Sequence, residues 1–463
     1  MAYHGADPST FDRGALAGHG PARRGEIMRL IVCFIARLKP RASLTILCLT
    51  ALGLTARSAG AQFLQYTPPG GPEIRPESRQ DQLKRELAEA RYHLGPVRIA
   101  PWASVHDVAY VQSLLSTGGA RQPNDVTATV GAGFRAFLHD GPKATWVAQV
   151  LPEYVWWQRQ TERRQLDGRY LLGFYGYFNH LTVEARAGRE QQQQLVTPEV
   201  PVPVSFRRDG GELLLELQLS GAFSAFSTLS FNRQDNLVEQ LPDPLTSDLR
   251  RLDRDENVER VGLRWRPDRQ WTVGLGAEHS DVTFAHGGLD LSNQGTAPVA
   301  EVRFQGNRLG FQLDAADRSL SGVSGSNFVP FHKLTGNTSF TLGSTERLAT
   351  TVYANRNLVY SLAEGSSYFV DERVGTAVNA GFGQHATGRV FVEGGHEQYT
   401  GFASGPPQPR VSVLSYGAGL TFGLRQGLTL GLQGLRSQFD SSLPGGDRTY
   451  TSVGLTVNLT RFQ

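Results

Sequence analysis

The sequence predicts an all-β protein, a transmembrane antiparallel up-and-down β-barrel of about 18 strands, with 16 as the alternative. The first sign is a regular alternation of connection lengths. A long loop over 281–296 is followed by the tight turn Gly306-Asn307, and the same rhythm runs from residue 98 to the end. The second sign is period-two alternation of apolar and polar residues within the segments between connections. The third is the spacing of the tryptophans.

The chain begins with a leader, predicted over residues 1–61. Three basic residues between 37 and 41 precede an apolar run over 44–56, and Ala59-Gly60-Ala61 follows. This order is typical of an export signal, and it predicts cleavage between Ala61 and Gln62. An uncleaved anchor is the alternative, and Met28 competes with Met1 as the start.

Cysteine and charge both change once the leader is set aside. Cys33 and Cys48 lie within it, so the mature chain is predicted to have no disulfide and no cysteine for a lipid anchor. Subtracting the leader's charge of +5 from the chain's +3 leaves about −2. The sequence therefore gives no reason to expect a nucleic-acid partner.

Residues 62–97 are predicted to form a periplasmic linker and one short helix. The linker, 68–76, is rich in proline and glycine, and the helix covers 77–92. Leu83, Leu87 and Ala90 mark one face of the helix, and charged residues cover the rest. The helix is too polar to cross a membrane. It is either a lid or docking point or a solvated helix without a special role.

The barrel domain is predicted over 98–463. Its strands are expected at 98–111, 126–139, 144–159, 167–178, 180–190, 211–221, 223–233, 257–266, 270–281, 297–305, 308–318, 331–342, 347–360, 367–383, 387–400, 411–424, 427–439 and 449–461. An even number of strands places both chain ends on one side, which export through the leader makes the periplasm. The strand at 98–111 has the least regular pattern, and the even count depends on it.

The polar phase of the strands is predicted to face the interior. In 257–266, for example, Val261, Leu263 and Trp265 alternate with arginines. A shift of one residue would turn those arginines to lipid, at roughly 2–4 kcal/mol each near the midplane. The predicted pore-lining residues are Arg135, Glu184, Arg186, Glu216, Arg260, Arg264, Arg266, Glu278, Glu301, Arg303, Asp314, Lys333, Asp371, Arg373, Arg389 and Glu393.

All six tryptophans are predicted to mark the two membrane interfaces. The periplasmic belt would hold Trp102, Trp146, Trp265 and Trp271, and the outer belt Trp156 and Trp157. Trp146 and Trp156 are ten residues apart, roughly 33 Å along a strand. A strand tilt of ~40° reduces this to about 25 Å, the height of the apolar band of a barrel.

The predicted lumen carries both signs of charge, which suits neutral or weakly charged solutes better than one class of ion. Pairing of opposite charges that merely braces the wall is the alternative. Arg260, Arg264 and Arg266 have no acidic partner within their own strand, so they are the first candidates for a functional lining. His396 and Glu397 lie at a strand end, where a role at the rim is expected.

Eighteen strands leave an aqueous bore unless a segment fills it. Loops at about 191–210 and 234–256 are long enough to fold in. In the second loop, Asp253, Asp255 and Glu256 could hold a divalent cation, but the arginines among them favour a solvated charged loop. No metal site and no cofactor are therefore predicted. No nucleophile–base spacing indicates catalysis, so the chain is not expected to be an enzyme.

The stretch Tyr92-His-Leu-Gly-Pro-Val-Arg-Ile-Ala-Pro-Trp102 leads through Asp107-Val-Ala-Tyr110 to 125–135 (DVTATVGAGFR). It resembles the opening of the β-barrel porin 2 family of bacterial outer-membrane proteins, some of which are linked to exopolysaccharide secretion. The resemblance implies a porin-like barrel and raises polysaccharide export as one function. Such barrels usually end on an aromatic residue in the apolar phase, whereas Phe462 here is out of phase and Gln463 follows it.

The predicted location is the bacterial outer membrane, and three functions compete. They are a channel for polar solutes or polysaccharide, an anchor or adhesin that acts through its outer loops with a blocked lumen, and a barrel enzyme, against which the missing catalytic motif argues. Expected partners are outer-membrane lipid, the outer-membrane insertion machinery and, for export, polysaccharide or its periplasmic export components. The sequence leaves the solute, the oligomeric state and an open or plugged lumen undecided.

Overall fold

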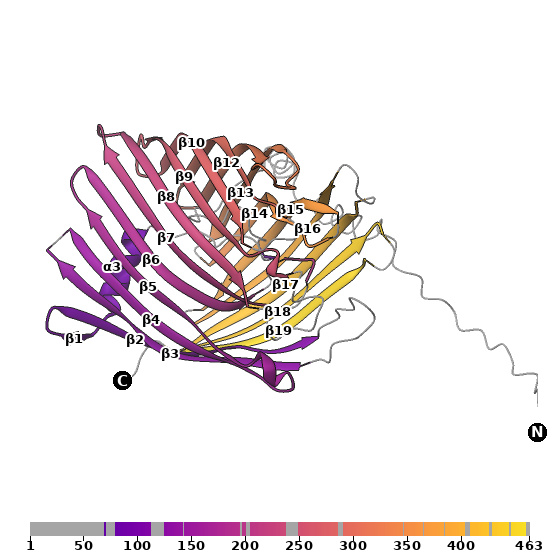
Figure 1. Ribbon diagram of the computed structural model, residues 1–463. Coiled ribbons are helices and arrows are strands. Elements are labelled where there is room, and N and C mark those ends of the chain that lie inside the picture. Colours follow the sequence, from indigo (N-terminus) through magenta and orange to yellow (C-terminus); the bar gives the residue numbers. More distant parts are fainter. Residues whose placement is uncertain are drawn as a thin grey trace, which may run out of the picture. The chain divides into compact units, whose positions relative to one another are not determined.

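A computed structural model shows the fold (Figure 1). It describes residues 69–70, 79–112, 125–141, 143–194, 197–200, 204–237, 249–285, 290–345, 347–363, 365–383, 385–402, 408–425, 428–443 and 446–459. All of these belong to one compact unit. The predicted leader, its cleavage site Ala61-Gln62 and the terminal Phe462-Gln463 lie outside the described residues. Among the described helices, none is long and apolar enough to cross a membrane.

Eighteen antiparallel strands, β2 to β19, form one closed sheet in which each strand pairs with its neighbours in sequence and β19 returns to β2 (Figure 1). This confirms the predicted fold. The strands are Val97–Gln112, Asp125–Asp140, Ala144–Trp157, Gln165–Tyr177, Leu181–Gln194, Val204–Gln218, Phe223–Asn236, Arg254–Trp265, Trp271–Phe284, Asn293–Gln305, Leu309–Gly322, Phe331–Thr345, Leu348–Tyr360, Ser366–Phe382, Ala386–Gly401, Arg410–Arg425, Leu428–Ser441 and Arg448–Leu459. A short 3-10 helix, η1 (Thr161–Arg163), follows β4.

The connections alternate in length as the sequence predicts. Two residues separate β13 from β14, and two separate β17 from β18, whereas seventeen separate β8 from β9. Every tight turn therefore lies at one end of the barrel, which we call the turn end. The longer loops lie at the other, the loop end.

Strand β2 is irregular, as its sequence pattern indicates. Its pairing with β3 shifts between His106 and Ala109, and Asp107 has a φ of 53°. A bulge of this kind adds a residue without breaking the sheet. Strand β2 nevertheless pairs with both β3 and β19, so it closes the barrel.

Alternation divides each strand between an outer and an inner face. In β9, Val261, Leu263 and Trp265 are 44–56% exposed, whereas the side chains of Arg260 and Arg264 between them are 15% and 14% exposed. Large exposed hydrophobic residues recur on the outer phase all round the barrel. Extensive exposed apolar surface of this kind marks an interaction or membrane surface, and it matches the outward apolar band of a membrane barrel.

Helix α3 (Arg79–Glu89) is shorter than predicted. The chain leaves it at Ala90 and forms a small hairpin, in which β1 (Tyr92–Leu94) pairs with the start of β2. Gly95 in this turn has a φ of 60°, a conformation that glycine adopts without strain. The end of the predicted helix is thus replaced by a turn that the Leu-Gly-Pro sequence favours.

Helix α3 lies against the inner face of the barrel near its turn end. Leu83 and Ala90 pack with the inward-facing Phe137, Val147 and Tyr175. The helix thus occupies part of the lumen rather than the space below the barrel.

Candidate functional site

The barrel interior is the candidate site, and its charged residues fall into distinct groups. All sixteen predicted lining residues lie in the inner phase of their strands or, for Arg266, directly after a strand, with contacts to inner residues. Most of them are held in ion pairs.

One network joins β9, β10 and β12. The guanidinium of Arg260 lies 2.7 Å from Glu278, and Arg318 lies 3.0 Å from the other oxygen of the same carboxylate. Asp314 lies 3.6 Å from Arg260. Arg318 and Glu278 are almost fully buried. The network therefore ties three strands together inside the barrel.

A second network surrounds Glu216 of β7. Its carboxylate accepts hydrogen bonds from Arg264, at 2.8 Å, and from Arg266, while Arg264 also pairs with Glu301. Arg260, Arg264 and Arg266 thus all have acidic partners on other strands: Arg260 on β10, Arg264 on β7 and β11, and Arg266 on β7. The sequence makes this trio the first candidate for a functional lining because its own strand holds no acidic partner. The partners lie on other strands, as in the alternative in which paired charges brace the wall.

A third network lies on β14 to β16. Arg373, with a side chain 1% exposed, contacts Asp371 at 2.9 Å and Glu393 at 3.0 Å. Glu393 also accepts hydrogen bonds from the Tyr353 hydroxyl and from the Gly70 backbone N–H. The chain before α3 therefore contacts this wall, since the Gly70 carbonyl also accepts a hydrogen bond from Arg389.

The loop ends of β14 and β15 bend into the lumen. Pairing of β14 with β13 stops at Arg356, although β14 continues to Tyr360. Tyr360 is in the outer phase of β14, yet its ring lies 4.8 Å from that of the inward-facing Phe284, and its hydroxyl accepts a hydrogen bond from Asn293. The two strands thus cover the inner face of β10 to β13.

An apolar cluster fills the space beneath these bent strands. It contains Leu252, Val282, Phe284, Leu291, Leu320, Phe328, Phe331, Leu358, Tyr360, Tyr368 and Val370. Residues of both strand phases meet here, which is possible only because the wall folds over itself. Much of the loop end of the barrel is therefore packed like a protein core.

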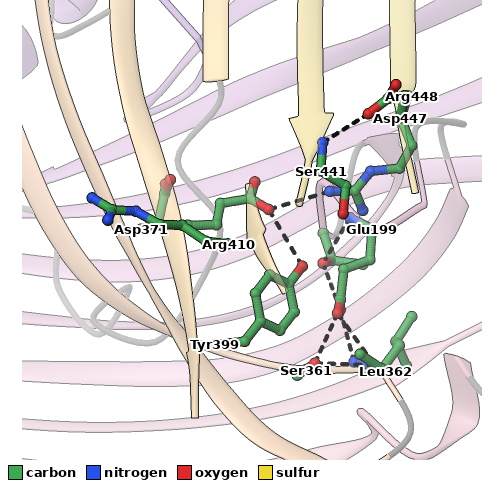
Figure 2. Close-up of polar contacts among 12 residues, drawn as sticks. Glu199, Ser361, Leu362, Asp371, Tyr399, Arg410, Ser441, Asp447 and Arg448 are labelled. Atoms are coloured by element: carbon green, nitrogen blue, oxygen red, sulfur yellow. Dashed lines mark hydrogen bonds and ion pairs between the residues drawn. The ribbon is translucent and has the colours of Figure 1, made fainter. Parts of the chain in front are cut away.

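The connection between β6 and β7 reaches the same region from the opposite wall, eight strands away. Glu199 accepts hydrogen bonds from the Ser361 hydroxyl and the Leu362 N–H, both at 2.7 Å, and from the Ala363 N–H at 3.2 Å. Figure 2 shows this carboxylate pointing at Ser361 and Leu362. The loop and the β14–β15 connection together narrow the lumen at its loop end.

The second long loop also contributes, but not as a cation site. Leu252 joins the apolar cluster, and Asp253 accepts hydrogen bonds from the backbone and side chain of Asn236. Glu256 pairs with Arg254, and Asp255 approaches Arg233 on the outer face. These carboxylates do not converge. Among the described residues, no group of three or more metal-ligating side chains is arranged to hold an ion.

The six tryptophans divide between the two faces. Trp146, Trp265 and Trp271 are exposed on the outer face near the turn end, and Trp156 is on the outer face near the loop end.

Trp102 and Trp157 face the interior instead. Trp102 pairs with the inward-facing Gly133, and Trp157 is 1% exposed with the Arg163 guanidinium 4.2 Å from its ring centre. Adjacent residues of a strand point to opposite faces, so Trp156 and Trp157 cannot both reach the lipid.

Several inward-facing residues were not predicted. Arg169, Glu190, Arg208 and Glu212 line the wall between β5 and β7. Arg208 falls in 204–210, which the sequence places in a loop but the structure places in β7. Pairing of Glu190 with Arg208 across the two strands is the sequence signal that could have extended β7.

No protein-family model matches this chain, so the resemblance to the β-barrel porin 2 family stays an expectation. No curated protein matches it at a significant level. Among solved structures, Pseudomonas aeruginosa OccK2 (OpdF) in complex with glucuronate aligns with 79% of this chain and 98% of its own, at 9% identity and a TM-score of 0.47.

The outer-membrane protein opdK from Pseudomonas aeruginosa aligns with 78% of this chain and 97% of its own, at 7% identity and a TM-score of 0.48. A bacterial polysaccharide outer membrane secretin covers 79% and 98%, at 11% identity and a TM-score of 0.33. At these identities and scores, the three structures bear on neither the solute nor the activity of this chain.

Proposed function

We propose that this protein is a channel for small polar solutes in the bacterial outer membrane. The observation that carries the proposal is the closed barrel of eighteen strands, apolar outside and lined by charged side chains inside. A barrel of this size is wide enough for an aqueous path unless it is filled. The leader over 1–61 agrees with export through the inner membrane.

The aqueous path would run along the wall of β4 to β8. The bent strands and their apolar cluster occupy the loop end over β10 to β15, and the ion-pair networks line the wall below. Residues Thr197–Val200 and helix α3 narrow the path at its two ends. Selection of solutes by size and hydrogen bonding then fits better than selection by net charge, because side chains of both charges line the path.

Single-channel recording in planar bilayers tests the proposal. The purified barrel is expected to give discrete conductance steps that depend weakly on the sign of the ion. A correctly inserted barrel without any conductance would instead support the second candidate, an anchor that acts through its outer loops. The filled loop end is the observation that favours this second candidate.

Export of polysaccharide is a narrower form of the channel proposal, and it rests on the sequence resemblance alone. Its test is deletion of the gene followed by measurement of surface polysaccharide. Unchanged polysaccharide would remove export and leave the solute channel standing.

A further inference from the structure

The inner wall between β4 and β8 contains a hollow of about 260 Å³ that the ion-pair networks leave open. Its floor is formed by Gly188 and Gly210, which face each other across β6 and β7. A Cβ atom on Gly210 would lie 2.4 Å from the side-chain oxygen of Asn232. Gly210 therefore makes room for the side chain of Asn232, which lines the hollow.

Three arginines from consecutive strands surround this floor, and each has a carboxylate nearby. Arg169 lies 3.2 Å from Glu153, Arg186 is hydrogen-bonded to Glu212, and Arg208 lies 3.7 Å from Glu190. Each of the three arginines is thus paired with one carboxylate, and two of these carboxylates, Glu190 and Glu212, line the hollow. Unlike the buried arginines of the networks, Arg169 and Arg186 are 40% and 34% exposed, so a solute can reach them.

The pairing of these arginines with carboxylates determines which class of ligand the hollow can bind. A carboxylate or an ammonium ion would have to compete with a partner already in place on the rim. A hydroxyl group donates one hydrogen bond and accepts others, so it can bridge a guanidinium and a carboxylate without separating them. Gln149 and Asn232, whose amides also donate and accept, complete the lining.

We propose that this hollow binds a neutral polyhydroxylated solute, of the size of one sugar ring, on its way through the barrel. The inference gives the proposed channel a solute class and rests on that function. Two contacts also link the hollow to helix α3. Gln149, which lines the hollow, accepts a hydrogen bond from Arg135, and the guanidinium of Arg135 pairs with Glu86 of the helix.

The test is equilibrium binding to the purified full-length barrel in detergent micelles, measured by saturation-transfer NMR. Glucose, glucuronate and glucosamine serve as probes that share one ring and differ in charge. Glucose is expected to bind saturably and about tenfold more tightly than either charged probe, a difference of ~1.4 kcal/mol. Tighter binding of glucuronate or glucosamine to the wild-type barrel, or no saturable binding of glucose, would overturn the proposal.

Two matched variants locate the binding. Glu212→Gln leaves Arg186 without its carboxylate, so preference is expected to shift from glucose to glucuronate. Glu184→Gln is the control. Glu184 lies on β6, two residues from Arg186, and accepts a hydrogen bond from the Tyr177 hydroxyl outside the hollow. An equal shift in both variants would contradict binding at the hollow. A barrel that binds glucose but does not conduct would refute the channel alone, and a conducting barrel without binding would refute this inference alone.

Discussion

The wall of β9 to β16 and the wall of β4 to β8 carry similar residues and use them differently. On the first, arginines such as Arg318 and Arg373 are buried and paired with carboxylates of the same wall. On the second, Arg169 and Arg186 keep a third or more of their surface exposed around a glycine floor. Charged residues in a barrel lumen are thus of two kinds. Those on the wall of β9 to β16, which we call the braced wall, hold the strands together. Those on the wall of β4 to β8, which we call the open wall, remain available to a solute.

Removing a buried guanidinium should have the largest effect. Arg373→Ala leaves Asp371 and Glu393 facing each other without a cation, and breaking a buried pair costs about 3–5 kcal/mol. Arg169→Ala, on the wall of β4 to β8, is expected to cost less, because its side chain is 40% exposed and Glu153 keeps its contact with His106. Urea unfolding of the barrel in detergent, followed by tryptophan fluorescence, measures both. Equal losses would show that the two walls do not differ.

The next largest effect should be at the narrowed loop end. Glu199→Gln removes the charge that accepts hydrogen bonds from Ser361, Leu362 and Ala363, and bonds to a charged group are worth about 1.5–3 kcal/mol. The open fraction in single-channel records is expected to rise roughly tenfold. Glu259→Gln removes the same charge from an exposed position on the outer face and should change nothing. If both variants gate like the wild type, the Glu199 contact does not close the path.

Packing of the braced wall can be tested with glycines. A Cβ on Gly375 would lie 2.4 Å from the ring of Tyr353, within the Arg373 network. Gly375→Ala is therefore expected to destabilise the barrel by about 1–3 kcal/mol through overpacking. The matched change Gly419→Ala, also on the inner phase, meets its nearest atom at 3.6 Å and should be nearly neutral. Thermal unfolding in detergent compares the two variants. An unchanged unfolding temperature for Gly375→Ala would mean that this wall can accommodate the extra methyl group.

Most of the fold could be predicted from the sequence because it depends on local alternation. Eighteen strands and the order of short and long connections follow from period-two patterning and turn residues. The start of β7 is not predicted because its pattern is reversed there: Val204 and Phe206 face inward, and the polar Ser205, Arg207 and Asp209 lie in the outer phase. The residue type of Trp157 predicts a position at the membrane interface, whereas its place in the inner phase of β4 makes it face inward.

The candidate site could be predicted only in part, because its organisation depends on contacts between distant residues. Fifteen of the sixteen predicted lining residues lie in the inner phase of their strands, yet nothing in the sequence indicates that Arg264 meets both Glu216 and Glu301. The inward bend of β14 and β15 was also not predictable. It brings Tyr360, in the outer phase, onto Phe284, and local patterning assigns each residue to one face only.

The smallest expected effect is at helix α3, where Glu86 forms a partly exposed ion pair with Arg135 of β3. Glu86 lies 2.6 Å from Arg135, whose side chain is 36% exposed, so Glu86→Gln should change barrel stability by less than ~1 kcal/mol. The helix itself packs through few apolar contacts, and local opening should respond more than global unfolding. Amide hydrogen exchange of 79–89 is therefore expected to accelerate several-fold while β3 exchanges as before. Unchanged exchange in the helix would mean that Leu83 and Ala90 alone hold it in the lumen, and that its position does not depend on the charges beside the hollow.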